Sequence, residues 1–202
     1  MNYLEKMTRE YFQSGLTIPE YMKELRNYRS LVKKLLKSTQ AEDEQVELLK
    51  EKLQGLHGPI SASAQTEDWC GDWAANMPYL NDFFDRAGVE FRVFRGESHP
   101  ELKERYRREG VGHIPVISLW DVEGEEIARW VEAPRKVAAM KTRWKKEHPQ
   151  LMELYDKQAD DRQAAKEFAK LYRVFLERMI HWYKEEGMWR ETGEEIIRGI
   201  RL

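Results

Sequence analysis

The stretch Trp69-Cys70-Gly71-Asp72-Trp73 holds the single cysteine of the 202-residue chain. A short segment rich in small residues comes before it, and a helical pattern follows it to residue 87. The sequence therefore predicts that Cys70 lies where a strand passes into the N-terminus of a helix. At that position unpaired backbone N–H groups and the helix dipole favour a thiolate over a thiol, so we expect Cys70 to be an activated nucleophile.

Two carboxylates beside the cysteine work against this activation. Asp68 and Asp72 each lie two residues from Cys70, and a nearby carboxylate disfavours a second negative charge. We therefore expect the pKa of Cys70 to fall below its ordinary value of about 8.5, but by less than in a loop with neutral or basic neighbours. Trp73, one turn further on, is expected to place a flat apolar surface beside the sulfur.

Outward from this stretch, residues 57–147 alternate between strand and helix patterns. The turn at Asp121-Val122-Glu123-Gly124 joins the last two predicted strands as a hairpin. The order strand, helix, strand, helix, strand, strand, helix predicts an α/β fold with helices on both faces of a sheet. The predicted strands are 59–64, 89–94, 116–120 and 126–131, and the predicted helices are 74–87, 100–108 and 134–146.

Helical patterns fill the first 56 residues, which we predict to be an N-terminal helical extension. Thr17-Ile18-Pro19-Glu20 and Thr39-Gln40-Ala41-Glu42 both fit the capping box that begins a helix. Gly55 is expected to end the second helix. The apolar residues at helical spacing are Tyr21, Met22, Leu25, Tyr28 and Leu31 after the first box, and Val46, Leu49 and Leu53 after the second.

Residues 148–202 are predicted to be a C-terminal helical extension, which leaves residues 57–147 as the central domain. A broad apolar stripe runs along this extension, and such a stripe is more often core than a partner-binding surface. Oligomer formation through the helical extensions stays open as an alternative. The stripe comprises Phe168, Leu171, Tyr172, Phe175, Leu176, Met179, Trp182 and Tyr183, and a last short helix is predicted around Ile196, Ile197, Ile200 and Leu202.

Composition excludes several classes of function. The net charge is −2, from 34 basic and 36 acidic residues, whereas nucleic-acid binding needs a basic face. We expect no membrane span, because no run of 18 apolar residues occurs. The first six residues lack the apolar core of a secretory signal.

The single cysteine and the histidine positions bound the chemistry further. One cysteine cannot form an internal disulfide, which fits a reducing cytoplasm, and it cannot build a structural zinc site with several thiolates. We therefore predict a cytoplasmic protein without a metal or bound cofactor. Four of the five histidines are scattered without a metal-ligand pattern: His57, His99, His148 and His181.

The central domain resembles the thioredoxin superfamily in the order and spacing of its motifs. Trp69-Cys70-Gly71 matches the start of the family's Trp-Cys-Gly-x-Cys loop, and Pro78 stands where the family's active-site helix carries a proline. His113-Ile114-Pro115-Val116 is similar to the cis-proline segment, and a hairpin with Gly124 in its turn follows it. The resemblance implies a thioredoxin-like fold with a central mixed sheet. The string Glu67-Asp68-Trp69-Cys70-Gly71-Asp72 with an N-terminal helical extension also looks like a bacterial thioredoxin-like group.

Two departures from the family pattern change the chemistry that the resemblance implies. Trp73 stands where the family has its second cysteine, and Ala64 stands where thioredoxins carry a buried acid six residues before the first cysteine. That acid serves the proton of the second thiol, so the two losses are coherent. The single-cysteine loop implies a monothiol thiol–disulfide oxidoreductase that acts through Cys70 and a mixed disulfide.

The resemblance also implies a substrate groove and a co-substrate. With a cis Ile114–Pro115 bond, this backbone would lie against Cys70 and pair with an extended peptide, while Trp69, Gly71, Asp72 and Trp73 shape the site. A low-molecular-weight thiol or another protein would then release the mixed disulfide. The expected partners are protein or small-thiol disulfides.

Other functions remain alongside this one. Cys70 could be a relic in a non-catalytic adaptor or chaperone that binds proteins through the Pro115 groove, and sequence alone does not separate this from redox function. His113 could approach Cys70 as in a hydrolase, although no third orienting residue is evident. Cys70 could also form an intermolecular disulfide dimer.

Overall fold

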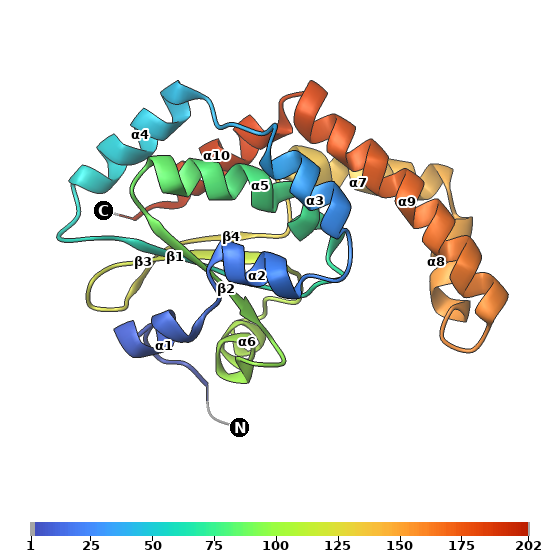
Figure 1. The fold of residues 1–202 in the computed structure, drawn as a ribbon, viewed down its shortest axis with the longest axis horizontal. Coiled ribbons are helices and arrows are strands. Elements are labelled where there is room, and N and C mark those ends of the chain that lie inside the picture. Colours follow the sequence, from blue (N-terminus) through green and yellow to red (C-terminus); the bar gives the residue numbers. More distant parts are fainter. Residues whose placement is uncertain (1–2, 202) are drawn as a thin grey trace. The chain divides into compact units, whose positions relative to one another are not determined.

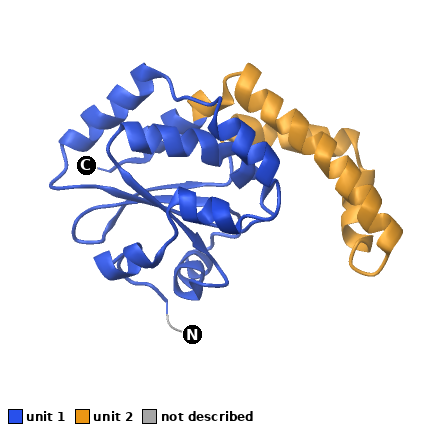
Figure 2. Cartoon of the chain, viewed as in Figure 1, with its two compact units in different colours: residues 1–133, 192–202 blue, residues 134–191 orange. Residues whose placement is uncertain are grey.

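The computed structural model describes residues 3–201 and divides into two compact units (Figure 2). Unit 1 comprises residues 1–133 and 192–202, and unit 2 comprises residues 134–191. These boundaries differ from the segments predicted at 56/57 and 147/148, because the N-terminal helices and the last helical residues share the core of unit 1. No helix among the described residues combines the length and the apolar character needed to cross a bilayer.

A four-stranded mixed sheet forms the centre of unit 1, as predicted (Figure 1). Its strand order is β2-β1-β3-β4, in which β1 and β2 are parallel and the other neighbours are antiparallel. The hairpin strands match their predicted bounds, whereas β1 begins two residues later than predicted. The strands are β1 (Ser61–Thr66), β2 (Glu90–Arg95), β3 (Val116–Trp120) and β4 (Glu126–Val131).

Helices cover both faces of this sheet, which confirms the predicted layers (Figure 1). The helix α5 (Gly71–Arg86) lies on one face, where α3 (Arg29–Leu36) and α4 (Asp43–Gln54) pack against it. The short α1 (Arg9–Ser14) and α6 (Pro100–Arg108) lie on the other face. The core beneath α1 and α6 contains Met7, Phe12, Phe94, Leu102, Tyr106, Val116 and Trp120.

The predicted first helix is wrong in one respect, because it is broken in two. Thr17 and Glu20 form the predicted capping box of α2 (Ile18–Glu24), but α3 begins only at Arg29 and Tyr28 has a left-handed backbone with φ of 56°. The chain between α2 and α3 does not continue the helix. It is hydrogen-bonded to the loop after β1 instead. Tyr28 Oη donates a hydrogen bond to the Trp69 carbonyl at 3.4 Å.

The first predicted capping box is confirmed, but the second, at Thr39–Glu42, is wrong. The helix α4 begins at Asp43 after Glu42, which makes no side-chain cap, although the helix ends at Gly55 as predicted. The chain before it is bonded to α5 and so does not form a helical turn. The Ala41 N–H donates to the Asp82 carboxylate at 2.8 Å, and Arg86 donates to the Ala41 carbonyl at 2.7 Å.

The predicted last helix is part of α10 (Met188–Gly199). Its residues in unit 1 are bonded to the central domain, since Thr192 donates to the Asn76 side chain at 3.0 Å and the Trp130 indole donates to Glu195 at 3.0 Å. Ile196 is buried. Leu202, which was included in the predicted helix, lies outside the described residues.

Unit 2 is built from α7 (Arg135–Glu147), α8 (Gln150–Lys157) and α9 (Arg162–Glu185). Asp161 caps α9 by accepting from the N–H groups of Gln163 and Ala164. Part of the predicted apolar stripe packs against the other helices of this unit. Phe175 packs against Trp144 with ring centroids 4.8 Å apart, and Phe168 packs against Tyr155 at 5.7 Å.

Candidate active site

Cys70 is the N-cap residue of α5, at the helix start where the sequence places it. The Trp73 backbone N–H donates to the Cys70 Sγ at 3.4 Å, a contact that stabilises a thiolate. The Sγ–H in turn donates to the Ile114 carbonyl oxygen at 3.3 Å, a contact that exists only in the thiol form. The Trp73 N–H thus favours the thiolate, whereas the Ile114 carbonyl favours the thiol.

The segment after residue 113 faces this sulfur. The Ile114–Pro115 peptide bond is cis, and its first carbonyl is the group that accepts from Cys70. The Pro115 carbonyl accepts from the Glu132 N–H at 2.8 Å, which ties the segment to the end of β4. Two motifs separated by 44 residues in sequence therefore meet at one point.

His113 does not join this site. Its side chain is 72% exposed, and its Nδ1 lies 3.4 Å from the Glu132 carboxylate. The geometry pairs His113 with Glu132 rather than with Cys70 and does not produce the Cys–His arrangement of a hydrolase. Among the described residues no group of three metal-ligating side chains is placed to hold a metal ion.

Burial differs sharply along the central loop. Trp69 is 62% exposed, whereas Cys70 is 5% exposed and Trp73 is 1% exposed. Gly71 is buried within the first turn of α5, and the Asp72 carbonyl there accepts from Asn76 at 2.9 Å. The loop therefore presents an indole to solvent and keeps its thiol beneath the surface.

Trp73 occupies the position of a second cysteine with a packed indole. Its ring meets Tyr21 of α2 edge-on at 6.0 Å and Phe91 of β2 at 6.2 Å between centroids. Trp73 therefore fills space between the N-terminal extension and the sheet, in addition to lying one turn from the sulfur. Ala64, in β1, is fully buried between Val93 and Ile117 on the neighbouring strands.

The charge of Asp68 is neutralised more than sequence reasoning anticipates. Its carboxylate lies 2.9 Å from the Arg95 guanidinium and accepts from the Arg26 backbone N–H at 3.3 Å. Arg95 also lies 3.4 Å from Glu24 and is stacked over the Tyr21 ring. Asp68 therefore opposes a Cys70 thiolate less than an isolated carboxylate would.

Beside this loop lies a cavity of about 800 Å³ that sequence analysis missed. Its walls come from three segments distant in sequence, and the basic residues of the first segment look like an ordinary solvated helix face when read alone. No sequence signal distinguishes them. The lining comprises Lys23, Glu24, Leu25, Arg26, Arg29, Glu67, Asp68, Trp69, Arg95 and Glu97.

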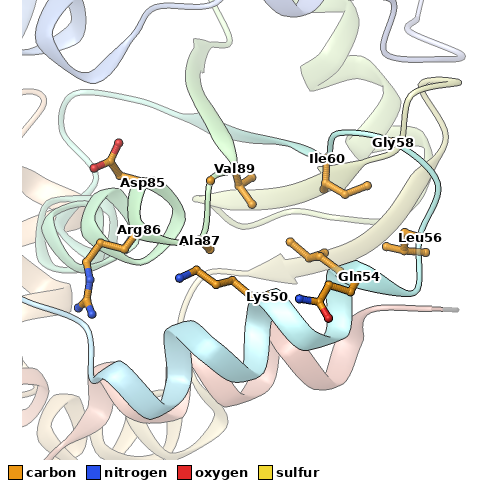
Figure 3. A pocket seen from close by; sticks show the side chains of 11 residues that line it. Lys50, Gln54, Leu56, Gly58, Ile60, Asp85, Arg86, Ala87 and Val89 are labelled. Carbon is orange, nitrogen blue, oxygen red and sulfur yellow. The ribbon is translucent and has the colours of Figure 1, made fainter.

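A second cavity, of about 490 Å³, lies at the other end of α5 (Figure 3). Lys50 and Gln54 line it from α4, while Asp85 and Arg86 line it from the last turn of α5. Since α5 has 16 residues, this cavity is separated from Cys70 by about 24 Å of helix. It is not part of the Cys70 site.

A cysteine at a helix start, opposite a cis-proline segment on a mixed four-stranded sheet, defines a thioredoxin-like protein. A family model described as thioredoxin matches residues 15–145, which is more than half of the chain. The chain belongs to this family. No curated protein matches it.

Two solved structures are similar in fold. A Pseudomonas aeruginosa protein of unknown function is 18% identical with a TM-score of 0.51, over 93% of this chain and 98% of that one. A crystallised HIV epitope-scaffold is 20% identical with a TM-score of 0.51, over 65% of this chain and 81% of that one. At these identities the similarity concerns the fold alone.

Proposed function

We propose that this protein is a monothiol thiol–disulfide oxidoreductase that acts through Cys70. The observation that carries the proposal is the position of the sulfur, which accepts from the Trp73 N–H at the start of α5 and faces the Ile114–Pro115 segment. The helix N-terminus favours a thiolate, which is the nucleophile in thiol–disulfide exchange.

The reaction begins with loss of the Cys70 proton, which releases the hydrogen bond to the Ile114 carbonyl. The thiolate then attacks one sulfur of a substrate disulfide. A new S–S bond forms between Cys70 and the substrate, the original S–S bond breaks, and the departing thiolate takes up a proton from solvent. The substrate disulfide is reduced by one thiol equivalent, and Cys70 is oxidised to a mixed disulfide.

Completion of the cycle needs a second thiol from outside the chain, since Cys70 is the only cysteine. A low-molecular-weight thiol attacks the Cys70 sulfur of the mixed disulfide, and the substrate leaves as a thiol. A second molecule of that thiol then attacks the small-thiol sulfur now bonded to Cys70, so that a low-molecular-weight disulfide leaves and Cys70 is again a thiol. We place this chemistry in the cytoplasm, because a reducing compartment supplies such thiols.

Burial of the sulfur favours a second candidate, a non-catalytic binding module that docks a peptide along the Ile114–Pro115 segment. Cys70 is 5% exposed and its proton has an acceptor in the Ile114 carbonyl. In this alternative the thiol is a structural contact, and the backbone beside Pro115 binds a partner by strand pairing.

The rate of Cys70 alkylation as a function of pH separates the two candidates. The redox proposal expects a pKa clearly below the ordinary value of about 8.5, together with capture of a mixed disulfide by the native chain without reductant. Cys70→Ser provides the background and should capture nothing. A thiol that reacts no faster than free cysteine and captures no partner overturns the redox proposal and supports the binding module.

A further inference from the structure

The thiolate of Cys70 depends on the geometry of one helix cap. The sulfur belongs to the N-cap residue of α5, and the N–H that it accepts comes from Trp73, the third residue of the helix. A thiolate gains more from this N–H than a thiol does, because a hydrogen bond to a charged acceptor is stronger. The Sγ and this nitrogen are 3.4 Å apart, and the gain falls as either residue moves away.

The helix side of this cap is held by the N-terminal extension. The Trp73 indole is buried, and it meets the Tyr21 ring edge-on at 6.0 Å and the Phe91 ring at 6.2 Å. Tyr21 belongs to α2, which packs against β2, the strand that carries Phe91 (Figure 1). The position of Trp73 is therefore fixed by a contact between the extension and the sheet.

The loop before Cys70 is held by the same extension. The Asp68 carboxylate accepts from the Arg26 N–H at 3.3 Å, and the Tyr28 hydroxyl donates to the Trp69 carbonyl at 3.4 Å. Both donors lie in the connection between α2 and α3. Tyr28 makes its contact from a left-handed backbone with φ of 56°, and residues held in this region are often found at functional sites. The extension thus contacts the chain on both sides of the sulfur.

Tyr21 also contacts the ion pair that holds the loop side of the cap. The Arg95 guanidinium carbon lies 5.3 Å from the centroid of the Tyr21 ring, and an Arg95 nitrogen lies 2.9 Å from Asp68. Tyr21 is fully buried, and burial and then the charge of Asp68 raise the pKa of its hydroxyl. One ring therefore joins Trp73, after the sulfur, to the ion pair of Asp68, before it.

We propose that Tyr21 and Tyr28 are positioning residues for Cys70, through which the N-terminal extension holds the sulfur in line with the Trp73 N–H. Tyr21 acts on the helix side of the sulfur through Trp73, and Tyr28 acts on the loop side through the Trp69 carbonyl. The inference rests on the proposed function, because the thiolate that this geometry favours is the nucleophile of the proposed reaction.

The pH dependence of Cys70 alkylation by a small reagent tests the Tyr21 side. A hydrogen bond to a charged sulfur lowers a pKa by roughly one to two pH units. Tyr21→Leu removes the ring that meets Trp73 and loosens this bond, so we expect the pKa of Cys70 to rise by about half a pH unit. The thiolate fraction at neutral pH then falls about threefold. Tyr21→Phe keeps the ring and should keep the pKa within about 0.2 pH units of the native value.

The same measurement tests the Tyr28 side. Tyr28→Phe removes the hydrogen bond to the Trp69 carbonyl and keeps the aromatic ring. We expect a smaller rise in the pKa of Cys70, of about 0.3 pH units, because one neutral hydrogen bond is lost at a half-buried residue.

Helix α1, on the other face of the sheet, provides a matched control for each variant (Figure 1). Phe12→Leu removes a buried ring and costs stability, as Tyr21→Leu does. Tyr11→Phe removes one hydroxyl, as Tyr28→Phe does. Both controls should leave the pKa of Cys70 unchanged. Shifts in the controls as large as those in the Tyr21 and Tyr28 variants would show that any loosening of the fold changes this pKa, and would overturn the positioning role.

Failure of this inference and failure of the redox proposal give different results. A native Cys70 with the pKa of free cysteine overturns the proposed function, while the variants can still be compared with the native chain. An unchanged pKa in both Tyr21→Leu and Tyr28→Phe overturns the positioning role and leaves the redox proposal standing. A shift in only one of them overturns the assignment of the other residue. If Tyr21→Leu does not fold, the comparison of Tyr28→Phe with Tyr11→Phe decides, and equal pKa values there overturn the inference.

Discussion

Two cavities of unit 1 are both lined by arginines and carboxylates, but they use these charges differently. Around Glu126, in a cavity of about 530 Å³, the Glu126 carboxylate is 6% exposed and is shared by Arg105 and Arg129. Arg129 also pairs with Glu109. Beside Trp69, by contrast, Arg95 is matched and three further cations are not.

The cluster around Glu126 continues into the centre of the sheet. Ser118 donates to Glu126, and the Tyr106 hydroxyl lies 2.8 Å from the Ser118 oxygen. Burial is the main cause that raises the pKa of Tyr106. Every member has a polar partner, which is the condition under which buried polar groups stabilise a fold. The difference teaches that the paired charges around Glu126 form a structural network, whereas the exposed cations beside Trp69 take no part in one.

Among substitutions that remove a charge, Glu126→Gln should cause the largest loss of stability. It leaves Arg105 and Arg129, whose side chains are 13% and 22% exposed, without their shared carboxylate. We expect a loss of about 3 kcal/mol in the free energy of unfolding, measured by urea denaturation. Glu125→Gln is the control, since its side chain is 54% exposed and pairs with Lys6 at the surface. Equal losses in both variants would show that the cluster is not a stabilising unit.

Asp68→Asn should have an intermediate effect, because it removes one of the two carboxylates that serve Arg95. The Asp68 side chain is 17% exposed, and Glu24 stays near the guanidinium. We expect a loss of about 1.5 kcal/mol by the same measurement. Glu97→Gln, on the exposed rim, should leave the free energy of unfolding unchanged. If Asp68→Asn left the free energy of unfolding unchanged, the ion pair between Asp68 and Arg95 would not stabilise the fold.

Acidification should weaken the attachment of α1, because the contact between α1 and His99 requires a neutral imidazole. His99 lies 3.2 Å from the Ser14 hydroxyl and meets the Phe94 ring edge-on at 4.9 Å, and burial lowers the pKa of His99. Once α1 detaches, His99 regains its ordinary pKa of about 6.5 and takes up a proton more readily. Stability from this contact is therefore present above that pH and is lost as the pH falls below it. Hydrogen exchange of the α1 amides, corrected for intrinsic rates, should show this, and His99→Gln should remove the pH dependence.

Replacement of Lys23, Arg26 and Arg29 by Gln should affect stability least. These side chains are exposed and have no ion pair among the described residues, so we expect a change within about 0.5 kcal/mol in the free energy of unfolding. A larger loss would place these cations with the Glu126 cluster as structural groups and would remove the contrast between the two cavities.

Sequence patterns predicted the elements whose signals are local. The strands at 116–120 and 126–131 and the helix at 100–108 have the predicted bounds, since apolar runs, the Gly124 turn and a Pro at the helix start each act within a few residues. The helix start at Cys70 could be predicted for the same reason.

Features that depend on distant contacts escaped prediction. The break at Tyr28 accompanies its hydrogen bond to the Trp69 carbonyl, and the chain at Ala41 is bonded to Asp82 instead of starting a helix. The cavity beside Trp69 combines three segments that no short-range pattern relates. The neutralisation of Asp68 likewise depends on Arg95, 27 positions further along the chain.

The packing of Trp73 has a consequence for how such a site can change over evolutionary time. The indole contacts Tyr21 on one side and Phe91 on the other, so the N-terminal extension and the missing cysteine form one structural arrangement. Trp73→Cys would restore a dithiol sequence and at the same time empty a buried space, at a cost of about 4 kcal/mol. A change to a two-cysteine loop by this one substitution would therefore cost stability unless other substitutions in α2 filled the space that the indole leaves.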